Sequence, residues 1–386
     1  MTSSTTHQAN TGNSGQDERL YHVALSMLPH VGGALAKQLI SYCGSAEAVF
    51  TSPVRFLSRI PGIGEKIIGG IRKASDRLNR AEKEIEACDR QGIAILAYND
   101  ERYPERLRQI YDAPVLLYFQ GKADLNAGRV ISIVGTRQST AYGREIVGQL
   151  VNELLPYHPT IVSGLAYGID IHAHRAALKA GLTTVGVMGS GMDIIYPAVH
   201  RQEAAEMKQE GGLLTENPLG TRPDARKFPA RNRIIAAMSQ ATIVVEAAEK
   251  GGALITANLA NDYDREVFAV PGNLGQPYSQ GCNKLIHEHK AHILSRVSDV
   301  VELLNWDQPG VPKESPVQAR IEIEIDEEEQ KVVDVLTEKT EAILFDSLSW
   351  HAQMPVNKLA SVLLSLEFKG IVRSLPGRKY QLTGLK

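Results

Sequence analysis

The stretches Arg129–Arg137 (RVISIVGTR) and Thr160–Asp170 (TIVSGLAYGID) decide the fold of this chain. In each stretch an apolar run ends in small residues, and a helical pattern follows. This succession is typical of a buried strand in an α/β sheet, whose carboxyl end presents backbone N–H groups and a helix N-terminus to an anion. The guanidinium of Arg137 suits a phosphate, because it can donate paired hydrogen bonds to phosphate oxygens. The glycine spacing does not fit the dinucleotide fingerprint and no Walker lysine follows, so we expect a phosphate site of another kind.

The composition is that of a soluble globular protein with two or three domains. Its 386 residues are 43% hydrophobic and 22% charged, and the formal net charge is −2. A nucleic-acid site would therefore have to be a local basic patch. The three cysteines are scattered and odd in number, which favours a reducing, cytoplasmic location over a disulfide framework or a zinc site. We expect no membrane contact, because the sequence lacks both an apolar run of about 18 residues and a signal-peptide pattern.

Changes in composition divide the chain into five segments. We expect a disordered lead at 1–18, a helical domain at 19–90, an α/β domain at 91–305, an acidic, proline-containing linker at 306–328 and a winged-helix domain at 329–386. The lead is rich in Ser, Thr, Asn, Gly and Gln, a composition that cannot bury enough apolar surface to fold. The charge of the linker favours an extended chain, because like charges repel.

The helical segment contains two similar phrases, LPHVGG at 28–33 and IPGIG at 60–64, and each is followed by a helical pattern. This arrangement resembles a tandem helix-hairpin-helix or SAM-like module, in which glycine turns bring backbone N–H groups near a DNA phosphate. The alternative is a module that packs against other elements or binds proteins, since glycine also forms ordinary turns.

A bridge at 91–127 contains two short strand-like runs, 93–96 and 115–119. From Val130 onward, strand-like runs alternate regularly with helical patterns, and these runs lie at 130–134, 160–163, 183–188, 212–215, 242–246 and 266–270. Alternation of this kind predicts a parallel sheet that is covered by helices on both faces and that binds ligands at the carboxyl ends of its strands.

The C-terminal segment returns to helical periodicity. Three helical runs and a hairpin pattern predict a winged helix. Between His351 and Lys386 the sequence has six Lys or Arg residues and one acid. A basic surface there would suit DNA, and the alternative is a partner-binding or purely structural winged helix.

Small and polar residues follow the predicted strands and form the candidate site. They are Gly135, Thr136, Arg137, Ser163, Gly164, Gly168, Gly189, Ser190, Gly191 and Thr256. Because the carboxyl ends of parallel strands share one edge of the sheet, these residues let a ligand approach the main chain there.

A basic cluster from Arg222 to Arg233 adds to this candidate site. Its members of interest are Arg226, Phe228, Arg231, Asn232 and Arg233, and Arg201 lies further upstream. Cations together with an aromatic ring are typical of a groove for single-stranded nucleic acid. The alternative is a solvated loop that leads into a helix at Ile234.

Three further features give no independent site. Asp170 and His174 share a helix face, but no third ligand is evident, so we expect no metal ion. Cys282 has no identifiable base and is interpreted as a packed thiol. Glu246 ends a strand, where it is a general base if the chain is an enzyme, or an acceptor that holds a loop if the chain is a binding protein.

Seven phrases in order resemble the DprA/Smf family of DNA-processing proteins. They are IVGTRQSTAYG, SGLAYGIDIHAH, VMGSGMDIIYP, FPARNRIIAAMS, VVEAAEKGGALITA, EVFAVPG and GCNKLI. The resemblance covers about residues 92–294 and implies an extended Rossmann-like core with helical and winged-helix ends. It further implies a homodimer that binds single-stranded DNA, protects incoming strands during natural transformation and helps to load the recombinase RecA, without known catalysis and without a cofactor.

The resemblance also carries individual residues. Arg137 matches the arginine of the family's G-[ST]-R phrase, and Arg231 and Asn232 match its FPxRN phrase. The basic residue that follows the family's YP phrase is met here by Ala198 immediately and by Arg201 three residues later. The resemblance therefore assigns DNA binding to Arg137, Arg231 and Asn232.

Two other interpretations stay open. Nucleotide phosphoribohydrolases of the lysine decarboxylase-like group share this fold and use a PGGxGT loop with a catalytic glutamate. The corresponding loop here, Glu249–Thr256, has its glycines at a different spacing. Alternatively, the chain is a scaffold whose terminal modules bind proteins, in which case removal of either end would abolish partner capture and leave single-strand affinity intact.

Overall fold

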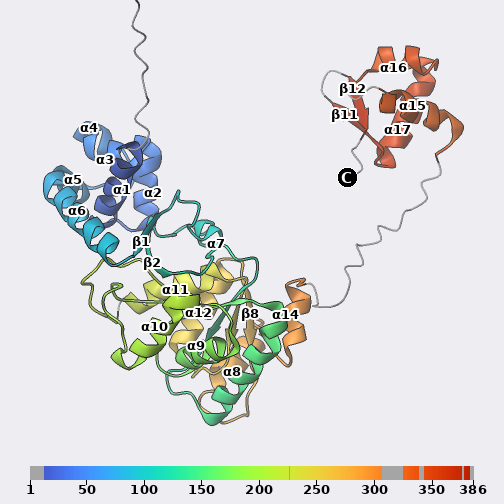
Figure 1. The fold of residues 1–386 in the computed structure, drawn as a ribbon. Coiled ribbons are helices and arrows are strands. Elements are labelled where there is room, and N and C mark those ends of the chain that lie inside the picture. The colour runs from blue at the N-terminus through green and yellow to red at the C-terminus, as the bar shows by residue number, and fades with distance from the viewer. Residues whose placement is uncertain (1–12, 226, 307–324, 339–342, 376–377, 383–386) are drawn as a thin grey trace, which may run out of the picture. The chain divides into compact units, whose positions relative to one another are not determined.

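A computed structural model describes residues 13–225, 227–306, 325–338, 343–375 and 378–382 (Figure 1). The chain forms two compact units, Met1–Pro309 and Gly310–Lys386. Most of the predicted lead and linker lies outside the described residues. A helix nevertheless begins at Asn13, so the end of the predicted disordered lead is helical. None of the described helices has the length and apolarity that a membrane span requires.

Six helices form the N-terminal part of the first unit. They are α1 (Asn13–Ser26), α2 (Gly33–Cys43), α3 (Ala46–Thr51), α4 (Val54–Leu57), α5 (Glu65–Arg72) and α6 (Ala74–Arg90). The two glycine phrases precede α2 and α5, where Gly32 and Gly64 are the N-cap residues. The first turn packs tightly against the α/β part, because a Cβ added at Gly33 would overlap the carbonyl oxygen of Ala113.

A nine-stranded sheet follows, in the order β1-β2-β6-β5-β4-β3-β7-β8-β9. The strands are β1 (Ala94–Ala97), β2 (Leu116–Gly121), β3 (Val130–Val134), β4 (Thr160–Ser163), β5 (Thr184–Val187), β6 (Gly212–Thr215), β7 (Ala241–Val244), β8 (Glu266–Ala269) and β9 (His292–Ile293). Strands β3 to β9 are parallel, whereas β1 and β2 extend the sheet in antiparallel fashion beside β6. The predicted α/β fold with a parallel sheet is confirmed, and only the two-residue β9 was not predicted.

Helices cover both faces of this sheet. They are α7 (Glu105–Arg108), α8 (Ala141–Leu154), α9 (Ile169–Ala180), α10 (Arg201–Glu210), α11 (Lys227–Met238), α12 (Gly252–Asp262), α13 (Gln280–His287) and α14 (Val297–Leu303), with 3-10 turns at Leu155–Tyr157 and Ala198–His200. One core lies between the sheet and α8, α9 and α14, and another between the sheet and α11, α12 and α13. From β3 the strand order runs through β4 and β5 to β6 on one side and through β7 and β8 to β9 on the other, so β3 pairs with both β4 and β7. Ligands bind at this switch point in open α/β sheets.

The N-terminal helices do not form a separate core. Their buried residues, such as Leu39 and Ile71, belong to one cluster with Tyr118 of β2, Met207 of α10 and Leu213 of β6. The helical part and the sheet therefore share buried apolar surface, which makes them one compact unit.

The second unit is a small winged helix with its own core. Its elements are α15 (Glu327–Glu338), β10 (Ile343–Leu344), α16 (Phe345–His351), α17 (Val356–Phe368), β11 (Val372–Leu375) and β12 (Lys379–Leu382). Leu348, Leu359 and Leu366 are fully buried between the three helices and the sheet. The strands pair in the order β10-β12-β11, so the predicted hairpin gains a third, two-residue strand.

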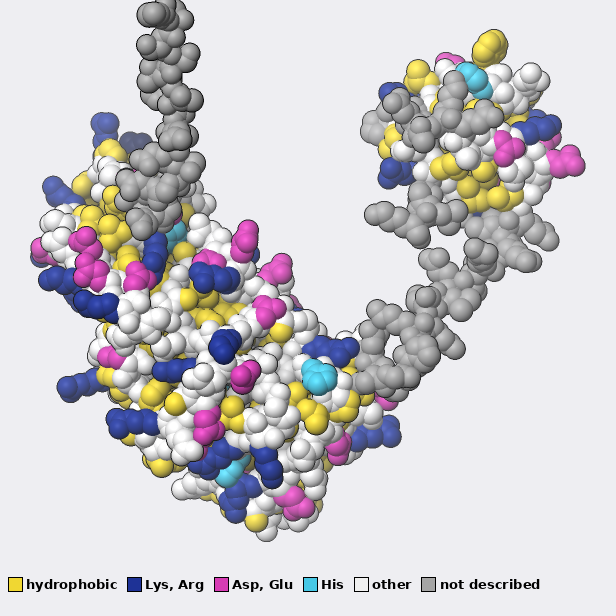
Figure 2. Space-filling model, in the orientation of Figure 1, with side chains coloured by type: hydrophobic (Ala, Val, Ile, Leu, Met, Phe, Trp, Pro, Cys, Tyr) yellow, Lys and Arg dark blue, Asp and Glu magenta, His cyan; other side chains and the backbone are white. Residues whose placement is uncertain are grey.

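The surface of this winged helix is less basic than its sequence suggests. The ammonium groups of Lys358 and Lys369 form ion pairs with Glu328 and Glu329 of α15. Figure 2 shows an apolar surface over α17, where the side chain of Phe368 is 85% exposed. The exposed residues of α17 thus include an apolar row, Val356, Leu364 and Phe368, and a single basic residue, Lys358.

Candidate nucleic-acid interface

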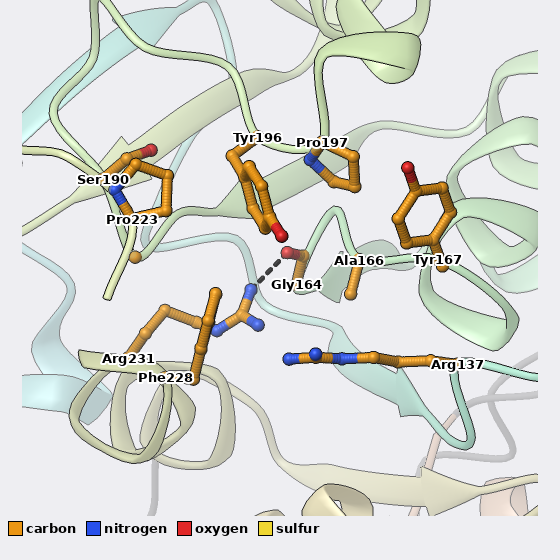
Figure 3. Close-up of a pocket in the computed structure, with 11 residues that line it drawn as sticks. Arg137, Gly164, Ala166, Tyr167, Ser190, Tyr196, Pro197, Pro223, Phe228 and Arg231 are labelled. Carbon is orange, nitrogen blue, oxygen red and sulfur yellow. Dashed lines mark hydrogen bonds between the residues drawn. The ribbon is translucent and has the colours of Figure 1, made fainter. Parts of the chain in front are cut away.

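Two adjoining cavities lie at the carboxyl ends of the central strands, and we call them together the strand-end groove. The smaller one is lined by Arg137, Gly164, Ala166, Tyr167, Gly189, Ser190, Tyr196, Pro197, Pro223, Phe228 and Arg231 (Figure 3). The larger one, about 460 Å³, is lined by residues that include Gly135, Thr136, Arg137, Asp170, Phe228, Arg231, Asn232, Gly251, Gly252 and Thr256. Both cavities lie at the switch point, where the fold predicts a ligand.

Arg137 and Phe228 lie at the junction of the two cavities. The guanidinium carbon of Arg137 is 5.0 Å from the centre of the Phe228 ring, within the range of a cation–π contact. Figure 3 shows this guanidinium pointing toward Phe228 and Arg231. Arg137 is exposed, and no carboxylate in the described part of the chain forms a salt bridge with it. Its positive charge is therefore available to an anion in the groove.

Arg231 is buried beneath this junction. Its Nη1 donates hydrogen bonds to the carbonyl oxygens of Gly164 and of Val187, the latter at 2.6 Å, and so ties α11 to the ends of β4 and β5. Burial lowers the pKa of the Arg231 guanidinium, and burial also raises the pKa of the neighbouring Asp170 carboxyl. Position 164 needs glycine, because a Cβ there would overlap the Arg231 guanidinium.

Three of the predicted turn residues shape the groove without lining it. The Ser163 hydroxyl is buried and donates a hydrogen bond of 2.6 Å to the carbonyl oxygen of Ile133. Gly168 has a φ of +77° and packs against the backbone of Thr136, so a side chain at this position would be both strained and obstructed. Gly191 packs against the backbone of the loop that follows β6. These residues therefore set the path of the main chain.

Asn232 and Thr256 both contact the carbonyl oxygen of Gly252 at the start of α12, and Asn232 thereby connects α11 with α12. The Asn232 amide donates to the carbonyl oxygen of Gly252 at 3.4 Å, and its oxygen accepts from Nε of Arg231 at 3.2 Å. The Thr256 hydroxyl is buried and lies 3.5 Å from the same Gly252 oxygen. Both side chains line the larger cavity while they fix the start of α12.

Glu246 follows β7 and holds the start of α8. Its Oε2 accepts the backbone N–H of Thr140 at 2.9 Å, and its Oε1 accepts the Thr140 hydroxyl at 2.5 Å. A Cβ added at Gly143 would overlap this carboxylate, so helix and carboxylate are in close contact. Of the two roles predicted for Glu246, the structure favours that of an acceptor which holds a loop.

Two predicted basic residues lie outside the strand-end groove. The Arg233 guanidinium forms an ion pair with Glu216 and donates to the carbonyl oxygen of Asp112. Because α11 begins at Lys227 and not near Ile234, Arg231 and Arg233 both belong to the helix. Side chains of residues two positions apart differ in direction by about 200° around a helix axis. Arg201, the first residue of α10, is exposed and lines neither cavity. Arg226 lies outside the described residues.

The groove also contains residues that sequence analysis did not single out, notably Tyr167 and Pro223. Tyr167 is 50% exposed, and its ring meets that of His200 edge-on at 5.3 Å. The Tyr196 ring is 6.2 Å from that of Phe228. The position of Tyr167 inside the turn between Gly164 and Gly168 was a signal that could have found it. Pro223 gives no such signal, because its loop reaches the groove only through the tertiary fold.

Among the residues that the structure describes, no three His, Cys, Asp or Glu side chains are grouped so that they could hold a metal ion. Cys282 is buried, and burial raises its pKa to about 12, as expected for a packed thiol.

A parallel sheet with a switch point at β3 and glycine turns at its strand ends is an extended Rossmann-like fold. Residues 94–305 match the family model described as DNA recombination-mediator protein A, and residues 314–378 match the DprA winged helix domain. The chain belongs to the DprA/Smf family of DNA-processing proteins.

Individual relatives agree with this assignment. Protein Smf of Synechocystis is 32% identical over 94% of this chain and 98% of its own length. The crystal structure of DNA processing protein A from Streptococcus pneumoniae has a TM-score of 0.62 and 32% identity, over 73% of this chain and 96% of that chain. The protein from Helicobacter pylori has a TM-score of 0.50 and 29% identity, over 55% of this chain and 95% of that chain, and its structure is described as one of a single-stranded DNA binding mode.

Proposed function

We propose that this chain binds single-stranded DNA in the strand-end groove. The observation that carries the proposal is the pairing of Arg137, a guanidinium without a salt bridge among the described residues, with the ring of Phe228 at the rim of the glycine turns. A cation that tracks phosphates beside a ring that stacks on a base is the combination by which proteins bind single strands. The relative from Helicobacter pylori supports the same ligand.

Each part of the groove has a distinct task in this proposal. Arg137 binds a phosphate, and the glycine turns let the strand approach backbone N–H groups. Phe228 and Tyr196 present rings on which bases stack without regard to sequence. Arg231 adds positive potential from beneath while it fixes the strand ends, and Asn232 orients the wall formed by α12.

Membership of the family supports two finer proposals. The first is that the chain forms a homodimer, which places two grooves on one strand and adds avidity. The second is that it protects incoming strands during natural transformation and helps to load RecA. Sedimentation equilibrium tests the dimer, and the rate of RecA assembly on protein-coated single strands tests the loading.

A salt titration with fluorescent oligothymidylate and with a duplex of equal length tests the central proposal. We expect tighter binding to the single strand, with log Kd rising linearly with log salt by about 0.7 for each phosphate contact. Absence of binding to oligothymidylate in dilute buffer would contradict the proposal.

The alternative of a nucleotide phosphoribohydrolase is tested by incubating the protein with AMP. We expect no release of adenine, because Glu246 is engaged by Thr140 and is not free to act as a base.

A further inference from the structure

The loop between β6 and α11 forms the outer wall of the strand-end groove. Pro223 of this loop lines the smaller cavity, Ala225 lines the larger one, and Phe228 follows in the first turn of α11. Ser190 and Tyr196, from the chain that follows β5, line the same cavity (Figure 3). The loop therefore borders the same cavity as the rings of Phe228 and Tyr196.

Two carboxylates hold consecutive backbone N–H groups of this loop. Oε1 of Glu84 accepts the N–H of Leu219 at 2.7 Å, and both oxygens of Asp193 accept the N–H of Gly220, at 2.9 and 3.0 Å. Asp193 belongs to the turn after β5, within the groove's own framework. Glu84 instead comes from α6 of the N-terminal helical part, 135 positions from Leu219 in the sequence.

The loop is also fixed to the glycine turn after β5. The N–H of Gly191 donates to the carbonyl oxygen of Thr221 at 2.9 Å, and a Cβ at Gly191 would lie only 2.5 Å from the carbonyl oxygen of Pro218. The Leu219 side chain packs into the core cluster that the helices share with the sheet. A displacement of Leu219 would therefore move the glycine turn and the wall together.

Glu84 is half-buried on α6. Burial raises the pKa of Glu84, and the hydrogen bond from the Leu219 N–H acts in the opposite direction. The carboxylate thus connects α6 with the wall of the groove.

We propose that Glu84 is a positioning residue for single-strand binding, through which α6 holds the wall of the groove in its binding conformation. The N-terminal helices are thereby part of the DNA site's framework, although none of their residues lines the groove. This inference rests on the proposed function of the groove.

The test compares Glu84→Ala, Glu84→Gln and Glu86→Ala in the full chain. Glu84→Ala removes the acceptor of the Leu219 N–H, Glu84→Gln keeps an oxygen at that place, and Glu86 is an exposed acid on the same helix. Anisotropy with oligothymidylate gives Kd and its salt slope, and a stoichiometric titration gives the fraction of molecules able to bind. Hydrogen exchange of peptides that cover 216–225 reports on the wall.

We expect Glu84→Ala to weaken binding about tenfold, as for one lost charge-assisted hydrogen bond, with an unchanged salt slope because no phosphate contact is removed. Exchange at 216–225 should accelerate. Glu84→Gln should lose less affinity than Glu84→Ala, because its neutral amide oxygen still accepts the Leu219 N–H, and Glu86→Ala should stay within about twofold of the parent chain. Equal binding by Glu84→Ala and the parent, equal losses in all three variants, or a loss of the competent fraction alone would overturn the inference. If the parent chain itself fails to bind, the proposed function falls, while the exchange data still decide whether Glu84 holds the wall.

Discussion

Replacement of Arg137 by alanine removes the one groove cation that is both exposed and free of a carboxylate partner among the described residues of the strand-end groove. The lost interaction is a charge-assisted hydrogen bond to a phosphate, which contributes about 1.5–3 kcal/mol. Affinity for a single strand should therefore fall roughly 10- to 100-fold at low salt. Because one phosphate contact is lost, the slope of log Kd against log salt should decrease by about 0.7. Folding stability should change by less than about 0.5 kcal/mol, since the side chain is exposed.

Fluorescence anisotropy with oligothymidylate at several salt concentrations measures both quantities. Arg201→Ala is the matched control, because Arg201 is exposed and lies outside the groove, and its affinity should change by less than about twofold. Arg137→Lys should give an intermediate affinity, since lysine keeps the charge but loses the planar, two-pronged donor. An unchanged salt slope for Arg137→Ala, or an equal loss for Arg201→Ala, would refute the assignment of Arg137 to a phosphate.

Three further predictions concern stability and the shape of the groove. Arg233→Ala should lower the free energy of unfolding by about 1–3 kcal/mol, because it leaves the half-buried Glu216 without its partner, and thermal unfolding measures this loss. In the winged helix, burial would raise the pKa of Glu329, but hydrogen bonds from Lys369 and Ser365 lower it to about 2. The ion pair therefore stabilises the fold above about pH 4.5. In urea unfolding of residues 310–386, the free energy of unfolding should fall by about 2–3 kcal/mol between pH 4.5 and pH 2, and Glu329→Gln should abolish this dependence on pH. Gly164→Ala should weaken oligothymidylate binding at least about tenfold, because its Cβ displaces the buried guanidinium beneath the groove; parent-like affinity would contradict that geometry.

The sheet could be predicted because buried parallel strands are short apolar runs bounded by small residues. All eight predicted strands form, while β9 and β10 escaped because two residues carry no periodicity. A helix was placed at Ile234 only in the alternative of a solvated loop, whereas α11 begins at Lys227. Pro229 is compatible with this start, because in the first turn of a helix its missing N–H costs no hydrogen bond.

The start of α11 at Lys227 explains why Arg233 lies outside the strand-end groove, where it was predicted. In a loop, Arg231 and Arg233 have no defined directions, and both suit a phosphate groove. In a helix they diverge, so that one reaches the ends of β4 and β5 and the other meets Glu216. Glu84 could not be found at all, because its partner Leu219 becomes a neighbour only through the tertiary fold.

In the winged helix, the net charge of the C-terminal tail alone overstates how basic the folded surface is. The tail from His351 onward is basic in sequence, but α15 supplies Glu328 and Glu329 to its lysines. The acidic linker predicted at 306–328 therefore ends inside the fold, because α15 begins at Glu327. Whether this unit contacts DNA or a protein stays a prediction.

The most direct test of the central claim is photocrosslinking of the full chain to oligothymidylate that contains 4-thiothymidine, followed by mass spectrometry of the crosslinked peptides. We expect crosslinks in the peptides that contain Tyr196 and Phe228, and these should be lost when unlabelled oligothymidylate competes. Crosslinks confined to residues 13–90 or 325–382, with none at the strand-end groove, would contradict it.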